Sequence, residues 1–265
     1  MAKPEQPTPD YVPGHNLLEG KVVVVTAAAG AGIGAAVVRK ALEEGAKAVV
    51  FSDTHERRLA EAEAALAEEF GADRVRQLVC NVTQEEDIQA LLDAAEEFGG
   101  VDVMINNAGL GGTSDILEMT DEDWGRVLDI TLTGTMRCIR AAGKRFVASG
   151  KKGIIVNNAS VIGWRAQEGQ AHYAAAKAGV MALTRCAAID LAPHGIRVNA
   201  VSPSLAMHPF LEKVTSPELL VELKGREAFG RAAAPWEVAN VMVFLASDYS
   251  SYMTGEVVSV SSQHA

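Results

Sequence analysis

The chain has 265 residues, 48% of them hydrophobic, and a formal net charge of −10, so it holds ample material for a buried core. The acidic balance argues against a nucleic-acid-binding surface, because phosphate contacts need clustered lysine and arginine. No apolar run approaches the roughly 18 to 20 residues of a membrane-spanning helix, and the first residues lack the apolar core of a signal peptide, so we expect a cytoplasmic protein without membrane or nucleic-acid partners.

The segment before the first expected strand carries four prolines among its first 14 residues and few large apolar side chains. Such a composition predicts a flexible N-terminal tail over residues 1–14, or an arm that lies on a neighbouring chain. Residues 15–265 are expected to form one domain, because no linker-like composition interrupts the pattern that follows.

From residue 22 onward, short apolar runs alternate with stretches whose apolar residues recur at helical spacing. This alternation predicts βαβ units, and hence a parallel sheet covered on both faces. The expected fold class is α/β, with a single doubly wound parallel-sheet (Rossmann) domain. The expected elements are, in chain order, strand 22–26, helix 34–44, strand 48–52, helix 55–70, strand 75–80, helix 84–98, strand 101–106, helix 120–149, strand 153–159, helix 170–191, strand 197–202, a looser helical segment at about 207–228, helix 235–246 and strand 256–261.

The loop after the first strand, "TAAAGAGIG", is rich in glycine. Gly30, Gly32 and Gly34 allow the backbone to approach a pyrophosphate, and the following helix would supply N–H groups and a partial positive charge. The spacing Gly30-x-Gly32-x-x-Ala35 fits the dinucleotide fingerprint, although glycine-rich turns of this kind also serve packing alone.

Asp53 follows the second strand, about twenty residues past the glycines. A carboxylate there can accept both ribose hydroxyls of NAD and would repel the extra phosphate of NADP. The alternative is a helix N-cap, since Asp53 or Thr54 precedes a helical run. The position relative to the glycines favours NAD as the cofactor, and Arg57 and Arg58 are expected on the solvent face of the helix.

The segment Asn106-Asn107-Ala108-Gly109 follows the fourth strand. Its amides can tie neighbouring strands together and its small residues leave room for a flat ring, although alone it is only a turn signal.

Cysteine usage indicates neither a disulfide framework nor a metal site. Cys80, Cys138 and Cys186 are few, odd in number and far apart, with no CxxC or histidine partner spacing. We expect ordinary thiols in a reducing compartment and no bound metal.

Ser160 follows the fifth strand, and Tyr173 comes thirteen residues later with Lys177 on the same expected helix face. A phenol with a pKa of about 10 must ionise near neutrality to act as a base, and a nearby ammonium and a positively charged nicotinamide favour the phenolate. Ser160 could hydrogen-bond a substrate oxygen as its charge changes. On its own, Tyr-x-x-x-Lys is a common accident on an amphipathic helix.

Together, these features resemble the short-chain dehydrogenase/reductase family over nearly the whole chain, from about Gly14 to the end. The motifs that occur in the family's order and spacing are the glycine loop, Asn106–Gly109, Ser160, "YAAAK" (173–177), "IRVNAVSP" (196–203) and "EVANVMVFLASDYSSYMTGE" (237–256).

The resemblance implies that Tyr173 is the general acid/base, that Lys177 binds the nicotinamide ribose and lowers the tyrosine pKa, and that Ser160 positions the substrate oxygen. It also implies that NAD lies across the strand ends. The family is dimeric or tetrameric, which implies a homo-oligomer with the helices around 120–148 and 168–191 at one interface. The cofactor-binding residues that the resemblance implies are Thr26, Ala28, Gly30, Gly32, Ile33, Gly34, Asp53, Asn81, Val82, Asn107, Ala108, Gly109, Tyr173, Lys177 and Pro203.

The sequence departs from the family at several positions. Thr131 stands where the family has a catalytic Asn that anchors a water-based proton relay. One hydroxyl cannot donate and accept as an amide does, so we expect the relay at Thr131 to be altered. Asn81 stands where an Asp usually contacts adenine, and Ser204 replaces a glycine. Met207 and His208 occupy the region of a hydroxyl-bearing residue that normally contacts the carboxamide.

The glycine loop also differs from the family in register. Counting back from Gly32 and Gly34, Ala28 falls at the family's first glycine and Thr26 sits one residue earlier than expected. Because alanine tolerates a positive φ poorly, we expect Ala28 to avoid that region and Gly30 to absorb the strain.

Three stretches, "GKVVVVTAAAG", "NNASVIGWRAQ" and "SSYMTGEVVSVSSQH", are similar to an actinobacterial group of the family. Its members act on the bicyclic coenzyme A thioesters left when the last rings of cholesterol-type steroids are degraded. The likeness implies a secondary alcohol or ketone on such a ring as substrate and a mobile lid at about 205–228. The substrate contacts it implies are Trp164, Arg165, Gln167 and His208, the alternatives being core packing for Trp164 and a solvated charge for Arg165.

Two other functions stay open from the sequence alone. A 3-oxoacyl thioester reductase of fatty-acid synthesis usually draws on NADPH, which Asp53 disfavours. A dinucleotide-binding sensor with weakened catalysis is supported by Thr131 and opposed by the intact set of Ser160, Tyr173 and Lys177.

Overall fold

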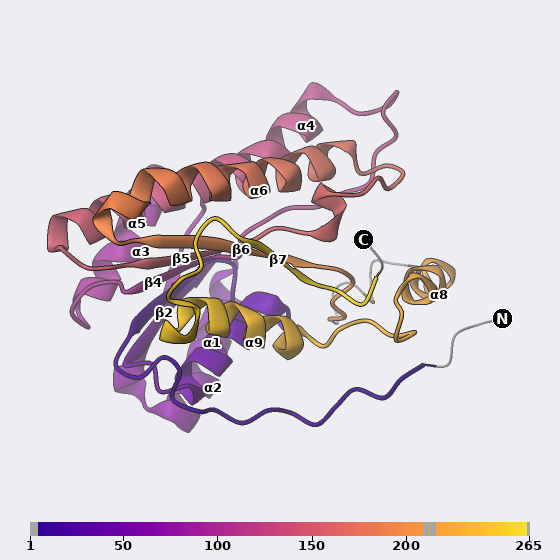
Figure 1. The fold of residues 1–265 in the computed structure, drawn as a ribbon. Helices are drawn as coiled ribbons and strands as arrows, with labels where there is room; N and C mark the ends of the chain where they lie inside the picture. The colour runs from indigo at the N-terminus through magenta and orange to yellow at the C-terminus, as the bar shows by residue number, and fades with distance from the viewer. Residues whose placement is uncertain (1–4, 209–211, 213–215, 264–265) are drawn as a thin grey trace.

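The computed structural model describes residues 5–208, 212 and 216–263, and its centre is a seven-stranded parallel sheet in the order β3-β2-β1-β4-β5-β6-β7 (Figure 1). The strands are β1 (Val22–Val25), β2 (Ala48–Asp53), β3 (Val75–Val79), β4 (Val103–Asn106), β5 (Ile154–Asn158), β6 (Arg197–Pro203) and β7 (Val257–Val260). Strand order reverses between β1 and β4, which confirms the predicted doubly wound fold. Sheets of this kind bind ligands outside the carboxyl ends of their strands at this point.

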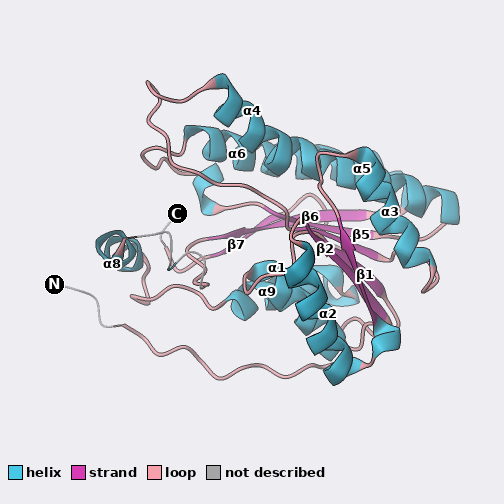
Figure 2. Cartoon of the chain, turned by 180° about the vertical axis from the view of Figure 1, so that it is seen from behind, coloured by secondary structure: helices cyan, strands magenta, loops and turns pink. Residues whose placement is uncertain are grey.

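The helices of the described chain are α1 (Ile33–Glu43), α2 (Glu56–Phe70), α3 (Glu85–Glu96), α4 (Asp121–Leu128), α5 (Gly134–Ser149), α6 (Ala171–Leu191), α8 (Pro217–Arg226) and α9 (Pro235–Ala246). Figure 2 shows α1, α2 and α9 on one face of the sheet and α3, α5 and α6 on the other. Val23 and Val25 of β1 belong to the core on the first face, and Val22 and Val24 to the core on the second. Successive side chains of a strand point to opposite faces, so an unbroken apolar run is what a doubly covered strand requires. None of these helices combines the length and the apolarity needed to cross a bilayer.

Residues 120–149, predicted as one helix, form α4 and α5 joined by a π-helical turn at Asp129–Thr133. Such turns insert an extra residue into a helix and are frequent at functional sites. The predicted long helix is therefore confirmed, and the π-helical turn within it, which includes Thr131, is a feature that the sequence did not predict.

The looser helical segment predicted at about 207–228 contains α8. The Ser216 hydroxyl caps this helix by accepting the N–H of Leu219 at 3.2 Å. Residues 209–211 and 213–215 of the same prediction lie outside the described part of the chain.

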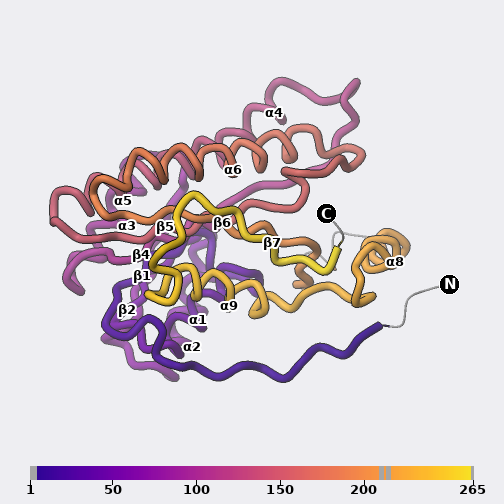
Figure 3. The backbone as a smooth tube through the Cα atoms, in the orientation of Figure 1, coloured from indigo at the N-terminus to yellow at the C-terminus, as the bar shows by residue number. Residues whose placement is uncertain are grey.

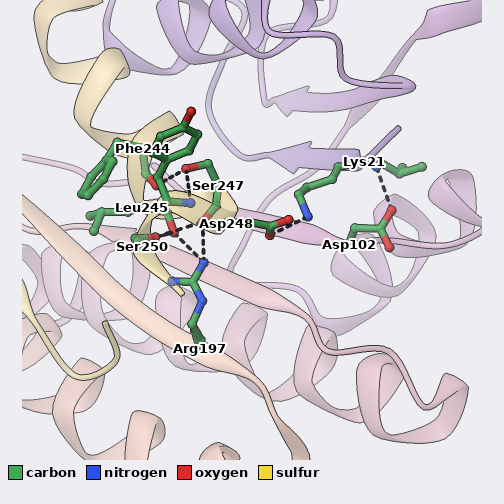
Figure 4. A network of polar contacts seen from close by, with 10 residues as sticks. Lys21, Asp102, Arg197, Phe244, Leu245, Ser247, Asp248 and Ser250 are labelled. Atoms are coloured by element: carbon green, nitrogen blue, oxygen red, sulfur yellow. Dashed lines mark hydrogen bonds and ion pairs between the residues drawn. The ribbon is translucent and has the colours of Figure 1, made fainter. Parts of the chain in front are cut away.

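A network of polar side chains lies at the amino ends of the strands, the edge of the sheet opposite the ligand-binding edge (Figure 4). Asp102, just before β4, accepts the N–H of Val22 at 2.8 Å. Arg197, the first residue of β6, donates to the carbonyl oxygens of Leu245 and Ser247 at 3.1 and 2.9 Å. These charges satisfy backbone groups and join β6 to the end of α9, so they serve the fold and leave the other edge of the sheet for a site.

The segment before β1 runs along the outside of α1 and α9 (Figure 3). The Tyr11 ring lies 5.3 Å, centroid to centroid, from that of Trp236 on α9. Lys40 of α1, only 2% exposed, donates to the carbonyl oxygen of Val12 at 2.5 Å and lies 3.5 Å from the Glu44 carboxylate. This part of the predicted tail is docked on the domain, while the flexibility of residues 1–14 stays a prediction.

Candidate active site

The turn from β1 to α1 forms one end of a cleft. Gly32 is the N-cap of α1 and, having no side chain, supplies no side-chain cap to the first N–H groups of that helix. A Cβ atom built on Gly34 would lie 2.5 Å from both the carbonyl oxygen of Ala27 and the amide nitrogen of Asn107, so only glycine allows this packing. Uncapped N–H groups beside a close-lying backbone are what a bound pyrophosphate uses.

The strain in this turn falls on Ala27. Its φ is 54°, in the left-handed region, whereas neither Ala28 nor Gly30 has a positive φ. The prediction that Ala28 avoids this region is confirmed, and the prediction that Gly30 absorbs the strain is wrong. The physical reason is a residue far along the chain, because the Asn107 amide donates to the carbonyl oxygen of Ala27 at 2.9 Å and holds that peptide in place.

Asp53 lies at the carboxyl end of β2 beside the same turn. Its carboxylate accepts the N–H of Ala29 at 3.3 Å and that of His55 at 3.2 Å. The N-cap of α2 is His55, so the alternative reading of Asp53 as that cap is wrong. Arg58 is exposed, as predicted, and its guanidinium lies 3.8 Å from the Asp53 carboxylate at the border of the cleft.

Side chains at the end of β4 tie three strands together. The Thr26 hydroxyl accepts the N–H groups of Asn107 and Ala108, each at 3.0 Å. The Asn106 amide donates to the Asn157 side-chain oxygen at 2.8 Å, which links β4 to β5. The prediction that these amides tie neighbouring strands is confirmed, and the bonds fix the backbone that borders the crevice.

Ser160, Tyr173 and Lys177 converge on the cleft from the end of β5 and from α6. The Lys177 ammonium, in a side chain whose residue is only 3% exposed, donates to the backbone carbonyl oxygen of Asn158 at 2.5 Å. It lies 5.6 Å from the centroid of the Tyr173 ring. The three residues therefore share one site, as the resemblance implied.

Burial shifts the pKa values of Tyr173 and Lys177 in the protein without cofactor. Burial raises the pKa of Tyr173 to about 12, while its hydrogen bond with Ser160 opposes that rise. Burial lowers the pKa of Lys177 to about 8. At neutral pH the phenol is thus protonated, and the lowering of the tyrosine pKa that the resemblance implies is not supplied by Lys177 alone.

Thr131 lies in the π-helical turn and is fully buried. Its hydroxyl accepts the N–H of Leu110 at 3.0 Å and donates to the carbonyl oxygen of the same residue at 3.2 Å. The single hydroxyl thus donates and accepts toward one residue, and the altered relay at Thr131 stays a prediction. Thr131 thereby holds the backbone next to Gly109, where a Cβ atom would lie 3.3 Å from the Lys177 nitrogen.

The cleft has a volume of about 860 Å³ and follows the carboxyl ends of the strands. Twelve of the predicted site residues line it, namely Gly30, Gly32, Ile33, Gly34, Asp53, Asn107, Gly109, Ser160, Tyr173, Lys177, Pro203 and His208. Nine do not, namely Thr26, Ala28, Asn81, Val82, Ala108, Thr131, Trp164, Arg165 and Gln167.

Asn81 and Val82 lie outside the cleft because their side chains serve local structure. The Asn81 side-chain oxygen accepts both the N–H and the hydroxyl of Thr83, at 3.1 and 3.0 Å. Val82 is buried against Gly134, where a Cβ atom would lie 2.7 Å from a Val82 methyl carbon.

The residues predicted to contact substrate do not all converge. His208 lines the cleft near Gly32, and burial holds its pKa below the usual range. Trp164 is 50% exposed, so core packing does not describe it. Arg165 donates to the side-chain oxygen of Gln263 near the end of the chain and is not merely solvated.

A buried carboxylate joins both ends of the segment that follows β6. Glu227, 1% exposed, accepts the N–H of Leu205 at 3.4 Å, the hydroxyl of Ser262 at 2.7 Å and the amide of Gln263 at 2.7 Å. Leu205 lines the cleft. Glu227 thus fixes the base of the predicted lid and, through Gln263, the loop that carries Arg165.

Sequence reasoning missed Asn158, which lines the cleft and anchors Lys177. Its signal was a polar residue at the end of an apolar strand, the position where ligand-binding residues of such sheets lie. Within the described residues, no cluster of three or more histidine, cysteine, aspartate or glutamate side chains is arranged to hold a metal ion.

Comparisons with known proteins agree with this geometry. Residues 27–262 match a family described as enoyl-(acyl carrier protein) reductase. The chain is 60% identical over 257 residues to the "(5R,7aS)-5-hydroxy-7a-methyl-1-oxo-2,3,5,6,7,7a-hexahydro-1H-indene-carboxyl-CoA reductase" of Mycobacterium tuberculosis, with 97% of each chain covered. It is 35% identical over 244 residues to a 3-oxoacyl-(acyl-carrier-protein) reductase of Vibrio cholerae, covering 92% of this chain and 96% of that one.

A solved structure supports the same relationship. A short chain dehydrogenase from Mycobacterium smegmatis superimposes with a TM-score of 0.86 at 56% identity, covering 98% of this chain and 99% of that chain.

Proposed function

Because the chain belongs to the short-chain dehydrogenase/reductase family and is an oxidoreductase, we propose that it transfers a hydride between NAD and a secondary alcohol or ketone on a steroid-derived coenzyme A thioester. The observation that carries this proposal is the convergence of Ser160, Tyr173 and Lys177 on a cleft that also holds the glycine loop and Asp53.

The residues of the cleft fit a dinucleotide. The uncapped start of α1 and the close packing at Gly34 suit a pyrophosphate, and the Asp53 carboxylate suits a ribose diol. Lys177 would hold the second ribose, from its anchor on Asn158. NAD, when bound, supplies the carbon that gives or takes the hydride.

The choice of NAD over NADP rests on the charge of Asp53. A carboxylate repels the additional phosphate of NADP, and the preference follows from that repulsion. Arg58, 3.8 Å away, offsets part of the negative charge. Asp53 also holds the N–H of Ala29, which keeps its carboxylate at the turn.

Proton transfer is assigned to Tyr173. With its pKa raised to about 12 by burial, the phenol is a proton donor at neutral pH, suited to protonating a ketone oxygen during reduction. In oxidation Tyr173 must first give up its own proton, and the resulting phenolate then takes the proton of the alcohol. The Ser160 hydroxyl, bonded to the phenol, would steady the substrate oxygen as its charge changes.

The substrate class is proposed from the relative of Mycobacterium tuberculosis, which is named as a reductase of a hexahydroindene-carboxyl-CoA. His208 on the cleft wall, with Trp164 and Gln167 exposed on the loop after β5, would contact the ring system or its thioester arm. The segment at about 205–228, including α8, would act as the lid.

Homo-oligomerisation is proposed on an apolar groove of α5 and α6. Its volume is about 530 Å³, and its lining includes Met136, Ile139, Val147, Leu183 and Leu191. Exposed apolar surface of this kind is typical of interfaces between copies of a chain. A dimer or tetramer would bury it.

Two alternatives are weaker. A 3-oxoacyl-(acyl-carrier-protein) reductase matches at lower identity and would sit poorly with Asp53. A dinucleotide sensor drew its support from Thr131, and the chain is an oxidoreductase whose Thr131 hydroxyl is engaged with Leu110.

The test is an activity assay with a hydroxy-indane-carboxyl coenzyme A thioester and a straight-chain 3-hydroxyacyl thioester, each with NAD and with NADP. We expect turnover of the bicyclic thioester with NAD, and kcat/KM at least about tenfold lower with NADP. Preference for NADP would overturn the cofactor assignment, and preference for the straight chain would overturn the substrate class.

A Tyr173→Phe variant is the matched control for that assay. It should bind NADH as wild type does and lose about 100- to 10,000-fold in kcat, because only the proton-transferring oxygen is removed.

A further inference from the structure

Asn158, the last residue of β5, contacts both halves of the cleft. Its backbone carbonyl oxygen accepts the Lys177 ammonium at 2.5 Å. Its side-chain amide donates to the Asn107 side-chain oxygen at 2.9 Å, and its own side-chain oxygen accepts no hydrogen bond from any described residue. The hydrogen bond to Asn107 is therefore the one that the Asn158 side chain makes within the described residues.

Asn107 in turn bonds the backbone of the glycine loop. Its amide nitrogen donates to the carbonyl oxygens of Thr26 and Ala27 at 3.2 and 2.9 Å. Ala27 is the residue with a φ of 54°, which a residue with a Cβ adopts only when its surroundings enforce it. The Asn107 amide is thus part of what keeps the turn in its strained conformation.

The orientation of the Asn107 amide depends on its neighbours. The oxygen and the NH2 group of a carboxamide are similar in size, so a 180° rotation exchanges donor and acceptor without a steric clash. With its oxygen toward the carbonyl of Ala27, Asn107 would meet repulsion in place of a hydrogen bond. The carbonyl oxygens of Thr26 and Ala27 require the nitrogen on their side, and the Asn158 amide stabilises this orientation by donating to the Asn107 oxygen on the opposite side.

The turn has little room to relax by other means. The carbonyl oxygen of Ala27 and the amide nitrogen of Asn107 both lie 2.5 Å from the position of a Cβ atom on Gly34, against the start of α1. A change in the Asn107 amide is therefore transmitted to the backbone of the glycine loop and to the Ala29 N–H that Asp53 accepts.

We infer that Asn158 is a positioning residue for the dinucleotide, which sets the glycine loop through Asn107 while its backbone holds Lys177. This inference rests on the proposed dinucleotide site. It goes beyond it by making the geometry of the loop after β1 depend on a side chain of β5, on the other side of the crevice.

The inference is tested with Asn158→Leu, which keeps the approximate size and removes the donor, and with Asn158→Ala where leucine does not fit. NADH affinity is measured by fluorescence titration, together with thermal unfolding and the KM values. We expect the Kd for NADH to rise about tenfold, the equivalent of one hydrogen bond, and the KM for the thioester to change little.

A double-mutant cycle with Asn107→Ala separates positioning from general destabilisation. In the Asn107→Ala background, Asn158→Leu should no longer change the NADH affinity, because its effect passes through the amide that is now absent. The matched control is Asn199→Ala, a buried asparagine of β6 that donates to the carbonyl oxygen of Met253 and accepts the N–H of Glu256. It should lower the unfolding temperature and leave the Kd for NADH near the wild-type value.

Each outcome has one meaning. Wild-type protein that does not bind NADH overturns the proposed function itself. Wild-type binding with an Asn158→Leu affinity within about twofold of it overturns the positioning role alone. An equal loss of affinity in both backgrounds also overturns it, since Asn158 would then act without Asn107.

Discussion

Thr131 satisfies both backbone polar groups of Leu110, accepting its N–H at 3.0 Å and donating to its carbonyl oxygen at 3.2 Å. The two residues are 21 positions apart, and the bond pair joins the π-helical turn to the segment that follows β4. A single hydroxyl satisfies both groups because one oxygen faces them at once. The consequence is a fixed backbone at Gly109, beside the Lys177 ammonium.

Thr131→Val should separate these bonds from packing. Valine has the same shape, but it removes the partner of the part-buried N–H and carbonyl of Leu110, so we expect a loss of about 1–3 kcal/mol in unfolding free energy. We also expect a lower kcat, since Gly109 borders the site. Urea unfolding and steady-state kinetics measure the two effects. Thr131→Ser keeps the hydroxyl and should retain most of both, and equal losses in the two variants would contradict the assignment.

The free energy of unfolding should depend on pH through the titration of Lys177. Its pKa is lowered from 10.5 to about 8 by burial, so between these values the unfolded chain binds a proton that the native chain does not. Stability then rises with pH across that window, because the unfolded state binds more protons. The difference in unfolding free energy between wild type and Lys177→Met should therefore grow in favour of wild type from pH 8 upward. A difference that stays constant from pH 7 to 10 would show that Lys177 titrates normally.

Much of the fold was predictable because it follows from local pattern. The run of valines in β1 is buried on both faces, as unbroken apolar strands in parallel sheets are. Asp53, Ser160 and Pro203 fall at strand ends, where such sheets bind ligands, so their place at the cleft followed from the alternation of elements.

The features that the sequence did not predict share a physical cause, which is contact between segments far apart in the chain. The φ of Ala27 is held by Asn107, 80 positions away, and the π-helical turn is bonded through Thr131 to Leu110. Neither contact leaves a mark in the local sequence. The raised pKa of Tyr173 likewise comes from burial, which the spacing of Tyr173 and Lys177 does not report.

Cofactor preference should respond to Asp53. Asp53→Ala removes the charge that repels the NADP phosphate and frees the Arg58 guanidinium, 3.8 Å away, to attract it. We expect the ratio of kcat/KM for NADP to that for NAD to rise by about tenfold or more. The double variant Asp53→Ala with Arg58→Ala should lose part of this gain. An unchanged ratio in Asp53→Ala would mean that the ribose lies elsewhere.

Substrate binding should respond to Glu227 without a change in dinucleotide binding. Glu227→Ala leaves Leu205, Ser262 and Gln263 without their shared acceptor, so the base of the proposed lid loosens. We expect a KM for the thioester raised about tenfold, with the Kd for NADH unchanged. Glu222→Ala is the control, since that glutamate on α8 is exposed and pairs only with Arg226 among the described residues. A matching rise in this control would place the effect in α8 as a whole.

The folded domain begins before β1, because the segment around Tyr11 and Val12 packs on α1 and α9. Lys40 is a buried ammonium whose partners include the carbonyl oxygen of Val12, and Tyr11 rests on α9. Shortening the chain to residue 15 would expose that charge and leave α1 without the contact along its outer side. A shortened form of this protein, for crystallisation or for a fused tag, should therefore begin no later than residue 10.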